Sequence, residues 1–388
     1  MTVWDDLVGQ PGAVASLRAA AASAARVVAG EPGGQGMTHA WLFTGPPGSG
    51  RSVAARAFAA ALQCPEQGCG HCVACHTALA GTSADVEVVA PEGLSIAVVE
   101  IRDLVLRAAL APHGSRWQVV VIEDADRLGE RAANALLKAI EEPPQRGVFL
   151  LCVPSPEDVP ATIRSRCRQV ALVTPSVAAV AEVLGRRDGV DPAMAAFAAR
   201  AAQSHVGRAR RLARDEEARR ERRAVLDLPR TATSVGGAFA AAADLVAAAK
   251  EVSQRSSAAL DEAETASLRE ALGATGKAAP RGTAGAFGAL EQRQKSRVTR
   301  TRRDALDRAL VDLAAYYRDV LAVQLGAADR VGLVNVDLAE PIGILARTSA
   351  PEATLRRVES VLACREALVA NVAPLLAVES MALALASG

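Results

Sequence analysis

Residues 45–52 read GPPGSGRS and fit the phosphate-loop pattern G-x-x-x-x-G-K-[ST] at every position except the lysine, which is replaced by Arg51. A short apolar run at 40–44 (AWLFT) precedes the stretch, and residues 52–62 (SVAARAFAAAL) predict a helix after it. In a strand–loop–helix setting, backbone N–H groups and the start of the helix converge on phosphate oxygens. The alternative is a glycine-rich turn without a ligand. The candidate nucleotide-binding residues are Gly45, Pro46, Pro47, Gly48, Ser49, Gly50, Arg51 and Ser52.

Arg51 raises the question of whether this loop supports hydrolysis. A guanidinium is planar and wider than an ammonium, so we do not expect Arg51 to take a lysine's place between the β- and γ-phosphates. Ser52 is the expected Mg²⁺ ligand. A general preference for arginine also explains Arg51, since only four of the 44 basic residues are lysines, at positions 138, 250, 277 and 295.

Alternating apolar runs and helical patterns follow the loop. Strands are expected at 86–89, 118–122 and 148–153, and helices at 95–109 and in the stretch that ends at 141. This alternation predicts an α/β domain whose parallel sheet is covered on both faces. After about residue 173 only helical segments are expected, apart from a Gly/Ala/Pro-rich loop at 273–288. We expect domains at 1–173, 174–224 and 225–388.

The composition excludes several classes of protein. The formal charge is +1 and aromatic residues make up 3%, which argues against independent binding of single-stranded nucleic acid. The first residues, MTVWDDLVGQPG, do not resemble a signal peptide, and no apolar run approaches the ~20 residues that span a bilayer. The expected location is the cytoplasm, with no membrane partner.

Two acids follow the strand expected at 118–122. Glu123 and Asp124 stand where a nucleotide hydrolase holds Mg²⁺ with one acid and orients the attacking water with the next. The usual order is Asp then Glu, so each side chain here differs by one methylene. The alternative is a solvated pair of acids at a strand end.

Four cysteines lie within twelve residues in the spacing C-x4-C-x2-C-x2-C. Four thiolates at this spacing can surround a tetrahedral Zn²⁺ and leave no position open for catalysis. An iron–sulfur cluster is the main alternative, and a metal-free group is the other. His71 and His76 are spare donors. The predicted metal ligands are Cys64, Cys69, Cys72 and Cys75.

Residues 162–167 (TIRSRC) follow the strand expected at 148–153. They place Arg164 and Arg166 on a predicted short helix. Arginines on a helix are usually solvated. An arginine that reaches a neighbouring subunit's γ-phosphate is the functional alternative.

The stretches NALLKAIEEPP at 134–144 and SRC at 165–167, together with the loop and the inserted cysteines, resemble the clamp-loader branch of the AAA+ ATPases. The motifs cover roughly residues 4–215. The resemblance implies an AAA+ P-loop domain with structural Zn²⁺ in a module at 64–75, a helical lid and an all-α C-terminal collar. It makes Arg166 a finger that completes a neighbour's ATPase site, and Arg210, in Gly207-Arg-Ala-Arg210, the lid's second sensor. The implied partners are γ/τ and δ subunits in a hetero-pentameric ring, the sliding clamp and primed DNA.

The chain departs from the ATPase pattern of that family at three places. Arg51 replaces lysine, Glu123 and Asp124 are inverted, and Val153-Pro154 stands where a polar first sensor is expected. These changes predict a subunit without ATPase activity of its own, in which ATP or ADP with Mg²⁺ is a doubtful ligand. The alternatives are an ATP-hydrolysing γ/τ-type subunit and a zinc- or iron–sulfur-dependent nucleic-acid-binding protein.

Overall fold

The computed structural model describes residues 2–32, 36–91, 93, 95–109, 112–113, 116–272 and 284–387. These residues form two compact units, Met1–Arg210 and Arg211–Gly388. The three domains expected from the sequence stay a prediction. Among the described residues, no helix combines the length and apolar character needed to cross a membrane.

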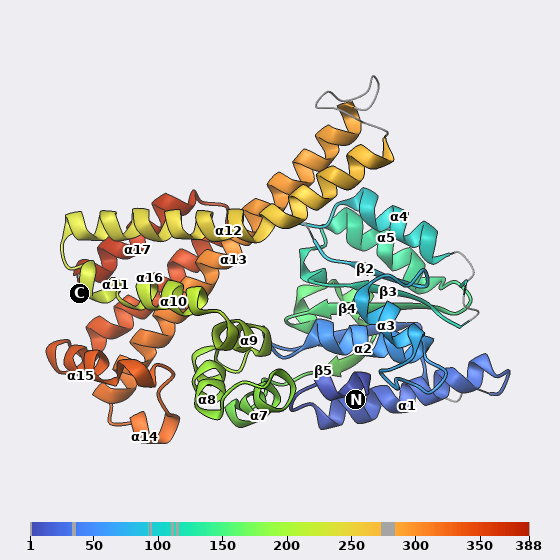
Figure 1. The fold of residues 1–388 in the computed structure, drawn as a ribbon, viewed down its shortest axis with the longest axis horizontal. Coiled ribbons are helices and arrows are strands. Elements are labelled where there is room, and N and C mark those ends of the chain that lie inside the picture. Colours follow the sequence, from blue (N-terminus) through green and yellow to red (C-terminus); the bar gives the residue numbers. More distant parts are fainter. Residues whose placement is uncertain are drawn as a thin grey trace. The chain divides into compact units, whose positions relative to one another are not determined.

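A five-stranded parallel sheet forms the centre of the first unit (Figure 1). Its strands lie in the order β2-β3-β4-β1-β5, with β1 between β4 and β5. Four strands were expected from apolar runs. The fifth, β5, escaped prediction because only one of its four residues, Val170, is buried. The bounds are β1 Ala40–Thr44, β2 Val86–Val89, β3 Gln118–Ile122, β4 Gly147–Val153 and β5 Arg168–Ala171.

Helices cover both faces of this sheet, and alternate strand residues point to opposite faces. Trp41 and Phe43 pack with η1 (Val3–Asp6), α1 (Pro11–Val28) and α2 (Arg51–Gln63). Ala40 and Leu42 pack on the other face with α4 (Val98–Ala108), α5 (Glu130–Glu141) and α6 (Ala161–Arg164). Burial on both faces explains why the central strands read as continuous apolar runs.

Short helices and three further α-helices complete the first unit. The short elements are α3 (Val73–Ala80), η3 (Ala125–Arg127) and η4 (Pro156–Asp158). After β5 follow α7 (Val177–Asp188), α8 (Pro192–Ala201) and α9 (Val206–Arg214), in which the unit ends. Asp191 caps α8 by accepting hydrogen bonds from the backbone N–H groups of Ala193 and Met194.

The second unit contains helices only among its described residues. Two long helices, α12 and α13, pack along each other and against α16 and α17. Their shared core includes Leu310, Leu313, Tyr317 and Val320. The bounds are α10 Glu216–Leu226, α11 Leu228–Thr231, α12 Val235–Ala271, α13 Ala284–Gln324, α14 Ala328–Val331, η5 Val336–Leu338, α15 Ala339–Thr348, α16 Pro351–Val369 and α17 Pro374–Ser387.

The loop expected at 273–288 is only partly covered by the structure. Residues 273–283 lie outside the described residues. The prediction is wrong for 284–288, because α13 begins at Ala284. Two glycines within five residues suggested a loop there, but the helix extends through them.

Candidate functional site

The phosphate-loop motif forms the predicted turn between β1 and α2. Thr44 ends β1, and Gly50 caps α2, whose first residue is Arg51. The Ser49 N–H donates to the Pro46 carbonyl at 3.1 Å and closes a turn. The Ser49 hydroxyl is buried and has no hydrogen-bond partner within the part of the chain that the structure describes. An anion in the loop would offer that hydroxyl an acceptor, so the loop fits a phosphate.

Arg51 folds back onto the loop. Its Nη1 donates to the backbone carbonyl of Gly45, the first residue of the motif. The guanidinium thus binds the protein's own backbone, whereas the lysine of the pattern reaches the β- and γ-phosphates. A phosphate would have to compete with this hydrogen bond.

The first acid after β3 is also bound within the chain. Glu123 accepts a charge-assisted hydrogen bond from Nε of Arg56 on α2, with an N–O distance of 2.8 Å. Asp124 takes the left-handed backbone conformation, with φ of 49°. The two acids therefore lie beside the loop helix, with Glu123 directed to an arginine.

A third acid, Asp126, lies in the same electrostatic neighbourhood. The pKa of its carboxyl is raised, mainly by partial burial and also by the nearby Asp124. Arg127 and Arg51 oppose this shift without reversing it. The sequence Glu-Asp-Ala-Asp contained this signal, and the prediction missed it.

The segment expected to hold the first sensor bonds to the loop instead. The Gly45 N–H donates to the carbonyl of Pro154 at 3.1 Å, and Val153 is fully buried and pairs with Thr44. The Ser52 hydroxyl, the expected Mg²⁺ ligand, lies within hydrogen-bonding reach of the Cys152 thiol. Burial raises the pKa of Cys152, so the thiol stays neutral.

The start of α9 lies directly against the loop. A Cβ on Gly48 would come within 2.8 Å of Cβ and Cγ of His205, so only glycine permits this approach. Arg210, the predicted second sensor, pairs through Nε with Asp188 Oδ2 at 2.7 Å. His205 and Asp188 carry no signal in the sequence, because their contacts are tertiary.

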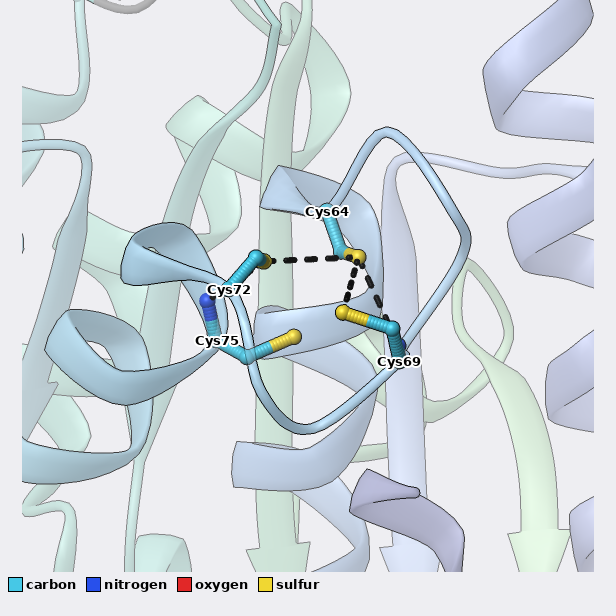
Figure 2. A group of neighbouring side chains, drawn as sticks. All are labelled: Cys64, Cys69, Cys72 and Cys75. Atoms are coloured by element: carbon cyan, nitrogen blue, oxygen red, sulfur yellow. Dashed lines mark hydrogen bonds between the residues drawn. The ribbon is translucent and has the colours of Figure 1, made fainter. Parts of the chain in front are cut away.

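The four cysteines converge as their spacing predicts (Figure 2). All four sulfur atoms lie within 4.8 Å of one another, and Cys64 Sγ is 3.6 Å from Cys69 Sγ and 3.7 Å from Cys72 Sγ. Four sulfurs bound at about 2.3 Å in a tetrahedron lie about 3.8 Å apart. The group therefore fits one metal ion.

Backbone N–H groups surround these sulfurs. The N–H groups of Cys69, Gly70 and Cys75 donate to the sulfurs of Cys64, Cys75 and Cys72, at 3.4 to 3.5 Å. Burial alone would raise the pKa of Cys64, but backbone N–H groups outweigh it and lower the pKa to about 7. Burial raises the pKa of Cys72 and Cys75. Such N–H donors orient and stabilise thiolate ligands.

The cysteine loop also holds the N-terminal segment. A Cβ on Gly68 would lie 2.7 Å from Val3 Cγ2, and the Val3 N–H donates to the Gly68 carbonyl at 3.1 Å. Trp4 Nε1 donates to the Gln67 carbonyl at 3.3 Å. The cysteine group and η1 thus form one packed substructure. His71 and His76 are exposed.

Arg166 lies outside the predicted short helix, because α6 ends at Arg164. Its guanidinium is about two-fifths exposed and pairs with Glu141 at 2.8 Å. Arg164 pairs more loosely with Glu157, at 3.7 Å. Cys167 packs against the apolar core beneath, so the backbone is anchored while Arg166 faces outward.

Arg166 and the phosphate loop lie at opposite edges of the sheet. We call the edge where the strands end the carboxyl edge and the edge where they begin the amino edge. Thr44 pairs with Ala171 at the carboxyl edge, whereas Trp41 pairs with Arg168 toward the amino edge. The three residue steps from Arg168 to Ala171 span about 10 Å. The structure therefore does not bring Arg166 into the chain's own loop.

Comparison with known proteins gives matches over the sheet region. Residues 25–176 match the family model described as "DNA polymerase III, delta subunit". Over 164 residues the chain is 41% identical to the DNA polymerase III subunit delta' of Pseudomonas aeruginosa, covering 40% of this chain and 50% of that protein. It is 36% identical to subunit tau of Bacillus subtilis over 137 residues, covering 34% of this chain and 24% of tau.

Over its sheet region, the chain is similar to the delta' and tau subunits of DNA polymerase III. It spans half or less of the length of the two curated relatives it matches here. Among solved structures, a DNA polymerase III gamma-subunit-related protein from Thermotoga maritima aligns with 95% of this chain and 99% of its own, with a TM-score of 0.41 and 14% identity. The fold of the described residues is an α/β unit with a parallel sheet followed by a helical unit, as expected from the sequence.

Proposed function

We propose that this chain is a δ′-type subunit that hydrolyses no ATP itself and lends Arg166 to the ATPase site of a neighbouring subunit. In this role it helps a ring of clamp-loader subunits place the sliding clamp on primed DNA, in the cytoplasm. The proposal rests on one observation above all, that the chain's own loop and its exposed arginine lie at opposite edges of the sheet.

The loop's own contacts support the absence of hydrolysis. Arg51 donates to Gly45, Glu123 accepts from Arg56, and Pro154 bonds to the loop backbone. An ATPase needs a cation on the phosphates and an acid that orients water. Here the groups at these places are bound within the chain.

The exposure of Arg166 supports the second half of the proposal. An arginine finger supplied from outside is worth about 10³–10⁵ in rate, because it stabilises charge that develops on the transferred phosphoryl group. Such a residue must sit at a surface and away from its own loop. Arg166 meets both requirements.

We also propose that the four cysteines bind one structural Zn²⁺. Four thiolates leave no open position for a reacting ligand, so the ion would stabilise the loop that holds η1. An iron–sulfur cluster inserts several atoms between its cysteines and would hold the sulfurs farther apart than a single ion does. The sulfur distances of 3.6 and 3.7 Å favour a single ion.

Replacement of Arg166 by alanine in the reconstituted complex tests the proposal. We expect ATP hydrolysis at the adjoining site to fall by about 10³-fold or more, and clamp loading to fall with it. Arg164→Ala is the control, because it removes an arginine two residues away. If hydrolysis in the Arg166→Ala complex stays within about twofold of the parent, the finger role is wrong.

An ATP-hydrolysing γ/τ-type subunit is the second candidate. The complete loop backbone and the free, buried Ser49 hydroxyl favour it, as does the match to the Bacillus tau subunit. ATP turnover by the isolated chain distinguishes the two. Turnover on the order of 1 s⁻¹ would favour the second candidate and turnover at background the first.

A further inference from the structure

A glutamate from another helix of the first unit pairs with Arg166. Glu141 is the last residue of α5, and its Oε1 lies 2.8 Å from Nη2 of Arg166. Nη1 of the same arginine donates to the Thr162 carbonyl at 2.9 Å and to the Ser165 hydroxyl at 3.3 Å. Two segments that are distant in sequence thus meet at one guanidinium.

Both backbones that carry the pair are anchored in the core. Leu136 and Ile140 of α5 are buried against the sheet, five residues and one residue before Glu141. Next to Arg166, the Cys167 thiol packs against the same core, and burial raises its pKa to about 12. The pair therefore joins two fixed points, and its geometry does not depend on a mobile loop.

The pair uses only part of the guanidinium. A guanidinium carries five N–H donors, and Arg166 makes two hydrogen bonds to described residues, both from Nη1, while Nη2 forms the ion pair with Glu141. The Nε–H makes no hydrogen bond to a described residue and is left for an acceptor outside the chain. A long arginine side chain loses rotamer freedom when it is fixed, and a fixed partner removes part of that cost before a ligand arrives.

We propose that Glu141 is a positioning residue for Arg166: it holds the guanidinium in the orientation from which it reaches a neighbour's phosphate. This inference rests on the proposed function, because it assumes that Arg166 acts on a neighbouring site. Glu141 itself touches no phosphate. Without Glu141, the positive charge of Arg166 remains, but its guanidinium is no longer held in one orientation.

Chemical modification of the isolated chain tests directly whether Glu141 restrains Arg166; we call this restraint the tether. A dicarbonyl reagent such as phenylglyoxal modifies arginines, and mass spectrometry gives the rate at each one. We expect Glu141→Gln to raise the modification rate of Arg166 about twofold or more relative to that of Arg164. The expected change is small because an exposed ion pair stabilises its arginine only weakly. Glu142→Gln is the matched control, since Glu142 is exposed and makes no ion pair among the described residues. An unchanged rate at Arg166 would overturn the tether.

The reconstituted complex tests the positioning role. We expect Glu141→Gln to lower kcat of the adjoining ATPase site about two- to fivefold with KM unchanged, and Glu142→Gln to leave both as they are. Glu141→Asp, which keeps the charge, should recover part of kcat. In an Arg166→Ala background, Glu141→Gln should change nothing further, because its effect passes through the arginine.

The outcomes separate this inference from the proposed function. If Arg166→Ala has no effect on ATP hydrolysis, the proposed function fails and the inference fails with it. If Arg166→Ala lowers hydrolysis and Glu141→Gln does not, only the positioning role fails. An equal loss from Glu141→Gln in the parent and the Arg166→Ala backgrounds would assign Glu141 a structural role and contradict the proposal.

Discussion

The two edges of the parallel sheet both carry charged groups, and they use them differently. At the carboxyl edge, Arg51 and Glu123 are bound within the chain, by the Gly45 carbonyl and by Arg56. At the amino edge, Arg166 is also paired within the chain, with Glu141, but it is exposed, and its Nε–H makes no hydrogen bond to a described residue. The charged groups of a motif that resembles an ATPase loop can therefore be bound within the chain, while an exposed arginine elsewhere can reach an external ligand.

Among substitutions that keep the charge, the largest effect should come from replacing the planar guanidinium of Arg166 by an ammonium. We expect Arg166→Lys in the complex to lower hydrolysis at the adjoining site by about 10²-fold, because an ammonium lacks the planar fork that binds phosphate oxygens. Single-turnover ATP hydrolysis measures the effect. Arg164→Lys serves as control and should leave the rate unchanged. A full rate with lysine at 166 would mean that charge alone suffices.

The cysteine group gives the next largest effect. We expect Cys75→Ser to lose the bound metal and at least about 3 kcal/mol of the stability of the first unit, because metal binding is coupled to folding. Emission from Trp4, which packs on the cysteine loop, should shift to the red. Metal content and denaturant unfolding provide the measurements.

Cys364→Ser is the control for that prediction, since Cys364 is a buried thiol of the second unit outside the metal-binding group. It should leave the metal content unchanged. Full metal content and unchanged stability in Cys75→Ser would contradict a structural site of four thiolates. Iron in the parent protein would indicate an iron–sulfur cluster in place of zinc.

Restoring the lysine of the phosphate loop tests whether Arg51 alone keeps the carboxyl edge from hydrolysing ATP. We expect Arg51→Lys to change ATP hydrolysis by the isolated chain less than about twofold, because Glu123 is still bound to Arg56 and Pro154 still replaces a polar sensor. Steady-state phosphate release measures this. Turnover on the order of 1 s⁻¹ would show that Arg51 alone keeps the loop inactive.

The smallest effect should follow from Glu123. We expect Glu123→Gln to cost about 0.2–1 kcal/mol of the first unit's stability, because its pair with Arg56 is partly exposed. ATP hydrolysis by the complex should stay the same. The Arg56→Ala variant should show a similar cost, and the double variant should cost less than the sum. A fall in hydrolysis would instead give Glu123 a role at a metal ion.

The sequence predicted the features that depend on local pattern. Apolar runs located four of the five strands, and the cysteine spacing predicted that the four thiols converge. It missed β5, in which a single buried residue leaves no pattern, and it placed Arg166 inside a helix that ends two residues earlier. Helix ends depend on capping and tertiary contacts, which a short motif does not encode.

The sequence could not predict which side chains are bound within the chain. The partners of Arg51, Glu123 and Arg166 are a backbone carbonyl, an arginine and a glutamate, at separations of 6, 67 and 25 positions. No spacing rule connects such residues, because the fold alone brings them together. Those partners decide whether a charged residue is available to a ligand.

The central claim is that the arginine at the amino edge, and not the loop at the carboxyl edge, supports ATP hydrolysis. The most direct test measures single-turnover ATP hydrolysis by two reconstituted complexes, one with Arg166→Ala and the other with Arg51→Ala in this chain. We predict that the first loses hydrolysis at the adjoining site by about 10³-fold, and that the second stays within about twofold of the parent. A loss with Arg51→Ala and a normal rate with Arg166→Ala would contradict the account.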